Sequence, residues 1–81
     1  MILYKFYHNV CGPCNTLRAY LKTVQLPSDI ELVEVDVTNP ANKDLMKKYN
    51  VIKVPTLVFE DGRTVEGFRS GEEIHKFIFG E

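Results

Sequence analysis

The chain has 81 residues, of which ten are basic and eleven acidic, so its net charge is −1 at pH 7. Hydrophobic residues make up 44% and charged residues 26%, an ordinary composition for a soluble globular protein with one modest core. Neither sign of charge forms a long block, which argues against nucleic acid or an anionic membrane as a partner. We therefore expect one domain over residues 1–81 that acts as a monomer.

Residues 1–10 are largely apolar, but this segment is too short for the core of a signal peptide and lacks a basic start. No apolar run approaches the roughly 20 residues that a membrane-spanning helix needs. The chain has two cysteines, whereas a secreted disulfide framework in so small a protein usually needs about four or more. These features predict an unprocessed protein that stays in the cytoplasm and has no membrane partner.

Residues 2–7 are aromatic and aliphatic side chains around a single lysine, a pattern typical of a short strand with little exposure. A helix is predicted to follow residues 11–13, because Pro13 suits a first helical turn. Pro27 is expected to end this helix. Its predicted apolar face consists of Leu17, Tyr20, Leu21 and Val24.

Residues 31–37 alternate between apolar and polar side chains and predict a second strand. Strand, helix and strand in this order imply a parallel pair with a right-handed crossover. A second helix is expected after Asn39, a capping residue, and Pro40, which suits the first turn. Its apolar stripe consists of Ala41, Leu45 and Tyr49.

The last third of the chain predicts a hairpin and a third helix. Residues 56–60 and 63–67 flank Asp61-Gly62, a sequence typical of tight hairpin turns. Residues 70–73 match a capping box. The apolar residues of the helix that follows are Ile74, Phe77 and Ile78. The predicted order is βαβαββα, an α/β fold in which a four-stranded mixed sheet has helices on both faces.

Cys11 and Cys14 enclose Gly12-Pro13, and three functions fit such a pair. A structural disulfide is one, although loop-closure entropy in so short a loop is worth only about 2 kcal/mol. A metal site is another, although zinc takes about four ligands and only His8 lies near enough in sequence to join the two thiolates. Redox exchange is the third and fits best, so we expect no metal and no cofactor beyond the pair itself.

Redox exchange fits because the pair lies where a predicted strand ends and a helix begins. Cys11 is near unpaired backbone N–H groups and the positive end of the helix dipole, which favour thiolate over thiol and can lower a cysteine pKa. Cys14 follows nearly one turn later and can reach back to Cys11, but it is more shielded. We therefore predict that Cys11 attacks a substrate disulfide and that Cys14 resolves the resulting mixed disulfide.

The sequence CGPC at residues 11–14, the sequence VPT at residues 54–56 and Gly67 after the hairpin resemble the thioredoxin family over about residues 2–78. The length is closer to that of a glutaredoxin, so the chain is identified as a small thioredoxin-like redoxin. The resemblance implies a thioredoxin-like fold. The chain departs from the family pattern at Val10, where thioredoxins usually carry a tryptophan.

The resemblance also implies a cis Val54–Pro55 bond that faces the cysteine pair. Such a bond would leave the backbone N–H and C=O of Val54 free to pair with an extended substrate strand. The substrate-binding residues carried over from the family are Gly12, Pro13, Val54, Pro55, Gly67 and Phe68.

The activity implied is that of a thiol–disulfide oxidoreductase that reduces disulfide-containing substrate proteins with electrons from a thioredoxin reductase. A glutaredoxin, with glutathione as the electron source, is the alternative. Glutaredoxins typically carry Pro-Tyr between the cysteines and Gly-Gly before the last helix, where this chain has Gly12-Pro13 and Gly67-Phe68. A further alternative is a non-catalytic binding module that uses the same groove.

Lys5 occupies the position where thioredoxins resemble one another in having a buried aspartate under the active site, and Glu34 stands where they usually have a lysine. A buried ammonium is costly unless it is paired, so we expect an ion pair between Lys5 and Glu34 with the charges exchanged. The alternative is that Lys5 extends to solvent without a partner. As a cation near the cysteines, Lys5 is expected to favour thiolate and so to tune the redox chemistry.

Overall fold

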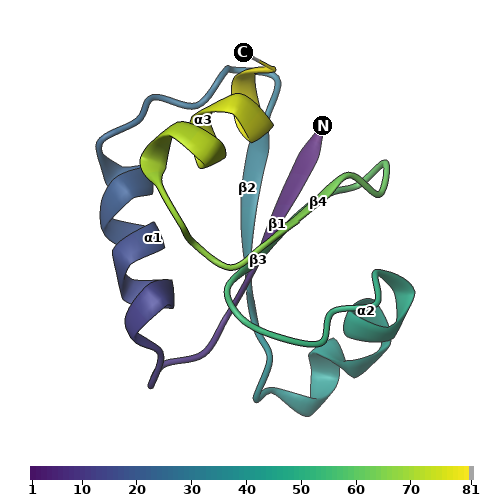
Figure 1. Cartoon of the computed structure of the whole chain (residues 1–81). Coiled ribbons are helices and arrows are strands. Elements are labelled where there is room, and N and C mark those ends of the chain that lie inside the picture. The colour runs from purple at the N-terminus through teal and green to yellow at the C-terminus, as the bar shows by residue number, and fades with distance from the viewer. Residues whose placement is uncertain (81) are drawn as a thin grey trace.

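The computed structural model describes residues 1–80, and Figure 1 traces the chain through them. The elements follow the predicted order of strands and helices, with one short 3-10 helix before the second α-helix. Their bounds are β1 Ile2–Tyr7, α1 Gly12–Lys22, β2 Glu31–Asp36, η1 Pro40–Asn42, α2 Lys43–Lys48, β3 Thr56–Phe59, β4 Thr64–Glu66 and α3 Gly71–Phe79.

The first helix is shorter than the sequence indicates. α1 ends at Lys22, so the prediction that Pro27 ends it is wrong and Val24 lies outside it. The backbone N–H and the hydroxyl of Thr23 both donate to the carbonyl oxygen of Tyr20, at 2.9 and 2.7 Å. These bonds close the last turn with 3-10 geometry, so the helix stops before the proline is reached.

The second predicted helix is divided between η1 and α2. Asn39 caps its start, as expected, because the side-chain oxygen accepts a hydrogen bond from the N–H of Ala41 at 3.0 Å. Tyr49 lies at the C-cap rather than inside the helix, because Asn50 adopts a left-handed conformation with a φ of 57°. Asparagine is one of the few residues that end helices in this way.

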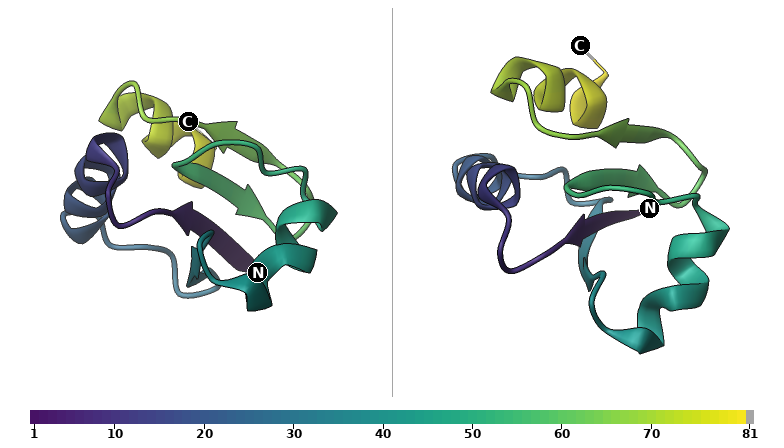
Figure 2. Two further views of the ribbon diagram at one scale, coloured as in Figure 1. Left: turned by 90° about the horizontal axis from the view of Figure 1, so that it is seen from below. Right: turned by 60° about the horizontal axis from the view of Figure 1, so that its bottom comes forward.

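The strands form one mixed sheet in the order β2-β1-β3-β4. β1 and β2 are parallel, whereas β3 is antiparallel to both β1 and β4, as the predicted parallel pair and hairpin require. Gly62 lies in the β3–β4 turn with a φ of +101°, which glycine adopts without a steric penalty. Figure 2 shows α1 and α3 on one side of the sheet and α2 on the other.

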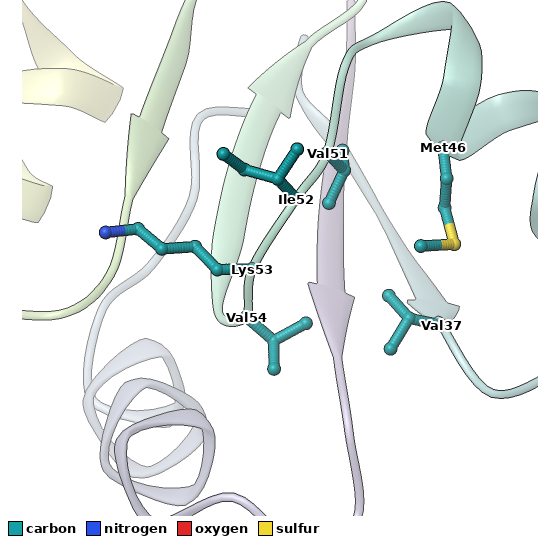
Figure 3. A pocket seen from close by; sticks show the side chains of 6 residues that line it. All are labelled: Val37, Met46, Val51, Ile52, Lys53 and Val54. Carbon is teal, nitrogen blue, oxygen red and sulfur yellow. The ribbon is translucent and has the colours of Figure 1, made fainter.

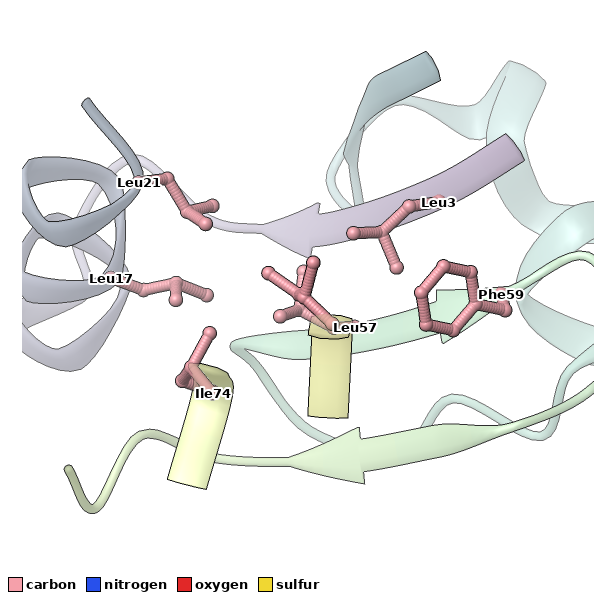
Figure 4. Close-up of a cluster of buried hydrophobic side chains, with 7 residues drawn as sticks. Leu3, Leu17, Leu21, Leu57, Phe59 and Ile74 are labelled. Carbon is pink, nitrogen blue, oxygen red and sulfur yellow. The ribbon is translucent and has the colours of Figure 1, made fainter. Parts of the chain in front are cut away.

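Two hydrophobic clusters lie on opposite faces of this sheet. Leu57 and Phe59 of β3 point into the cluster beneath α1 and α3, part of which is drawn in Figure 4. Val58, between them in sequence, points into the cluster that contains α2 side chains. Because both faces are covered, all the residues of β3 are buried. Within residues 1–80, no helix has the length and apolar character needed to cross a membrane.

Gly71 begins α3 directly against Tyr20 of α1. A Cβ at position 71 would lie 2.7 Å from Cε1 of the Tyr20 ring, and that ring packs against Phe68 at a centroid distance of 6.2 Å. The ring or the helix start would have to shift. We therefore expect Gly71→Ala to lower the free energy of unfolding by about 1–3 kcal/mol, as overpacking does, in urea denaturation.

Gly12→Ala is the matched control for this prediction. Gly12 begins α1 as Gly71 begins α3, but nothing lies within 4 Å of its Cβ position. With both variants measured in the disulfide form, Gly12→Ala should be unchanged or stabilised by up to about 1 kcal/mol, since alanine restricts the unfolded chain. Wild-type stability in Gly71→Ala would contradict the steric explanation.

Candidate active site

The two cysteines stand at the start of α1. Cys11 is the N-cap residue, with extended backbone angles, and Cys14 lies in the first turn. Their Cα atoms are 5.2 Å apart and the two sulfur atoms form a disulfide. The N–H of Cys14 donates to Sγ of Cys11 at 3.1 Å, so a backbone donor of the first turn points at the N-terminal sulfur.

The two cysteines differ in exposure. Cys14 is 1% exposed and lies on the inward stripe of α1 with Leu17 and Leu21, whereas Cys11 is partly exposed. A thiol that attacks another protein must be reachable, and one that resolves an intermediate need reach only its neighbour. The greater exposure of Cys11 fits the predicted role of attacking thiol, and the burial of Cys14 fits the role of resolving thiol.

The segment before Cys11 turns sharply away from β1. Nδ1 of His8 accepts a hydrogen bond from the N–H of Val10 at 3.0 Å, which tightens this turn, and Val10 itself is exposed. Among residues 1–80, no group of three or more His, Cys, Asp or Glu side chains could hold a metal ion.

Three segments that are far apart in sequence meet at one edge of the sheet. β1 ends at Tyr7, and residues 8–10 lead from there into α1. Antiparallel pairing places Thr56 opposite Phe6 and also opposite Glu66. The residues just before β3 and just after β4 therefore lie at the same end of the sheet as Tyr7, and from Tyr7 the chain continues to the cysteines.

The loop before β3 carries the predicted cis bond. The Val54–Pro55 peptide is cis, which confirms the predicted geometry of this bond. The N–H of Gly67 donates to the carbonyl oxygen of Pro55 at 2.7 Å, and the Thr56 hydroxyl donates to that of Lys53 at 2.7 Å. Val54's own N–H and C=O make no hydrogen bond with another residue of 1–80. They can therefore pair with an added extended segment.

The predicted groove residues come to this edge from three places. Gly12 and Pro13 are exposed at the start of α1, and the Val54–Pro55 loop is joined to Gly67 by the hydrogen bond just described. Phe68 differs from the others, because its ring packs on Tyr20 within the layer between the helices and the sheet. Phe68 is thus partly a core residue, packed in the layer beneath the helices.

A hollow beside this loop was not anticipated from the sequence. It has a volume of about 200 Å³, and Figure 3 shows its side chains coming from the end of β2, from α2 and from the loop before β3. The residues that line it are Val37, Met46, Val51, Ile52, Lys53 and Val54. Ile52 is 83% exposed. The apolar residues just before Val54-Pro55 were the available signal, but the contribution of Val37 and Met46 depends on the fold.

Asp36 ends β2 at the same edge of the sheet. Its pKa lies below the usual value, mainly because the hydroxyl of Thr38 donates to its carboxylate at 2.7 Å. The N–H of Thr38 also donates to it, at 2.9 Å, and lowers the pKa further. This carboxylate therefore stays ionised and fixes the turn that follows β2.

Lys5 and Glu34 form the predicted ion pair. They lie opposite each other on β1 and β2, with 2.8 Å between Nζ and Oε1. The Lys5 side chain is 3% exposed and that of Glu34 is 55% exposed. Lys5 Nζ also lies 5.7 Å from the centroid of the Tyr7 ring. The alternative, a lysine that extends to solvent unpaired, is wrong.

Comparison with known proteins agrees with this geometry. The family model described as Thioredoxin matches residues 1–79. The thioredoxin of Bacillus subtilis is 30% identical, with 96% of this chain and 79% of that protein covered. A mutant thioredoxin from Halobacterium salinarum has a TM-score of 0.72 and 32% identity over 98% of this chain and 72% of that one. Oxidized mitochondrial thioredoxin 3 from Saccharomyces cerevisiae has a TM-score of 0.73 and 27% identity over 99% of this chain and 77% of that one.

Proposed function

The chain belongs to the thioredoxin family and is a thiol–disulfide oxidoreductase, and from this premise we propose that it reduces protein disulfides with electrons from a flavin-dependent thioredoxin reductase. The observation that carries the proposal is the cysteine pair at the start of α1, with a partly exposed Cys11 and a buried Cys14. The reaction is an exchange of one disulfide for another and needs no cofactor beyond this pair.

In the proposed reaction the thiolate of Cys11 attacks one sulfur of the substrate disulfide. A Cys11–substrate disulfide forms, and the other substrate sulfur leaves as a thiolate that takes a proton from water. Cys14 then loses its proton and attacks Sγ of Cys11, which releases the second substrate thiol. Two electrons pass from the dithiol to the substrate, and the Cys11–Cys14 disulfide remains.

Substrate binding is proposed at the sheet edge beside the pair. The free N–H and C=O of Val54 support pairing with an extended substrate segment, which would align its disulfide with Cys11. Gly12 and Pro13, exposed next to Cys11, leave room for the substrate backbone. The hollow next to Val54 and the exposed Ile52 would accept an apolar side chain of that segment.

Thioredoxin reductase is proposed over glutathione because the matching family model and the Bacillus subtilis relative are both thioredoxins. Phe68 also fills, against Tyr20, the place after Gly67 where a glutaredoxin would have a second glycine. The test compares turnover on one model disulfide protein with NADPH and thioredoxin reductase against turnover with glutathione and glutathione reductase.

We expect the first system to support at least about ten-fold faster turnover than the second, a difference of about 1.4 kcal/mol in activation free energy. A variant with Cys11→Ser and Cys14→Ser together measures the background in both systems. Faster turnover with glutathione would overturn the choice of electron donor. Full biological function in the double variant would instead indicate a binding module.

We propose further that the protein acts as a monomer in the cytoplasm, where it carries electrons between a reductase and its substrates and contributes to cell redox homeostasis. A reducing compartment suits this assignment, because the pair must return to the dithiol after each turnover. Attachment of the protein to its reductase would be transient, as in other electron-transfer encounters.

A further inference from the structure

Lys5 is the one charged residue that is buried in residues 1–80. We propose that its ammonium group raises the reduction potential of the Cys11–Cys14 pair and so makes the protein a stronger oxidant than it would be without this charge. The proposal rests on the redox role of the pair. Lys5 acts in it as a positioning charge and does not touch the substrate.

The ion pair places its positive end inside and its negative end at the surface. The 2.8 Å contact joins a Lys5 side chain that is 3% exposed to a Glu34 side chain that is 55% exposed. Water screens the charge of Glu34 much more than that of Lys5. A group inside the fold therefore experiences more of the cation than of its partner.

Lys5 points into the layer between the sheet and α1. Side chains alternate along a strand, so Lys5 shares a face with Leu3, which packs against Leu17 and Leu21 of α1. Figure 4 shows Leu17 and Leu21 pointing from α1 toward Leu3. Cys14 lies on the same inward stripe of α1 as these two leucines. The buried cation and the buried sulfur thus face the same layer.

A cavity of about 170 Å³ marks where Lys5 meets α1. It is lined by Lys5, Arg18, Leu21, Lys22, Leu32 and Glu34. Arg18 follows Cys14 by about one helical turn, so this end of the cavity lies about one turn along α1 from the residue that carries the buried sulfur.

The charged residues around Lys5 come from α1 and β2. Arg18 and Lys22 are exposed on α1, and Glu34 lies on β2. β3 places the apolar Leu57 opposite Lys5. Glu34, half-exposed and screened by water, is therefore the one carboxylate among the residues that line this cavity, against the three cations Lys5, Arg18 and Lys22.

The sign of the effect follows from the charges of the two redox states. The disulfide is neutral, whereas reduction by two electrons gives a dithiol that ionises to thiolates. A nearby cation stabilises a thiolate and leaves the disulfide unaffected. It therefore favours the reduced form, which raises the reduction potential and lets thiolate form at lower pH.

The test is the equilibrium with glutathione, in which two glutathione molecules reduce the protein disulfide and become one glutathione disulfide. Relative to wild type, Lys5→Met should shift this equilibrium about ten-fold toward the oxidised protein, which equals about 30 mV for a two-electron couple. Thiolate absorbance of the reduced protein should also appear at higher pH. Methionine is unbranched and only one heavy atom shorter than lysine, and Glu34 is half-exposed to water, so the variant is expected to fold.

Two variants separate charge from shape. Lys5→Arg keeps the charge, so its equilibrium constant with glutathione should stay within about three-fold of the wild-type value, a difference of about 0.7 kcal/mol. Lys22→Met removes an equal charge from the same cavity at an exposed position, and should also stay within that range because water screens it.

Three results would overturn the proposal: an unchanged or higher potential in Lys5→Met, an equal fall in Lys5→Arg, or an equal fall in Lys22→Met. The measurement uses neither a substrate protein nor a reductase. Its outcome is therefore independent of whether the proposed electron donor is correct.

Discussion

Cys14→Ser is expected to accumulate a disulfide-linked adduct with substrate protein, whereas Cys11→Ser is expected to form none. The reason is the order of the two sulfurs: Cys11 caps α1 and is partly exposed, and Cys14 is 1% exposed behind it. Removal of the resolving thiol leaves the first exchange intact and blocks the second. Non-reducing electrophoresis and the intact mass of the adduct measure the result, and both variants should lose turnover to the uncatalysed rate.

The matched control is the reduced wild-type protein with the same substrate. It should show the adduct only transiently, because Cys14 resolves it by attack on the neighbouring sulfur. An adduct that accumulated in Cys11→Ser and not in Cys14→Ser would reverse the assignment of the two roles. Adducts of equal amount in both variants would show that exposure does not select the attacking thiol.

Phe59→Ala is expected to lower the free energy of unfolding by about 3–5 kcal/mol, as the loss of a buried aromatic ring usually does. Phe59 is 2% exposed on the central strand β3, and its ring lies 5.1 Å from that of Phe77 between centroids. A domain of this size has a total stability of about 4–12 kcal/mol. The substitution should therefore remove a large share of the total stability, which thermal or urea denaturation measures.

Phe59→Leu and Ile52→Ala serve as controls for this prediction. Phe59→Leu keeps an apolar side chain in the same site, so it should lower the free energy of unfolding clearly less than Phe59→Ala does. Ile52 is 83% exposed, so Ile52→Ala should stay within about 0.5 kcal/mol of wild type. If Ile52→Ala cost as much as Phe59→Ala, burial would not account for the difference.

Local patterns were sufficient for much of the architecture. Asp61-Gly62 predicted the hairpin and Ser70 the start of α3, since turn and capping preferences depend on a few neighbouring residues. The cysteine pair likewise showed its chemistry in sequence, because its two sulfurs are separated by less than one helical turn. The end of α1 was missed, because the hydroxyl of Thr23 ended the helix before Pro27 could.

The sequence by itself therefore determined the order of elements, the cysteine pair and, through family resemblance, the cis proline. Only the tertiary structure decided between a paired and a solvent-extended Lys5, showed that its partner Glu34 is half-exposed, and brought Met46 and Val54 together around one hollow. The physical reason is the distance along the sequence over which each interaction acts. Periodicity and capping act between residues a few positions apart, whereas burial and ion pairing depend on which distant segments the sheet brings side by side.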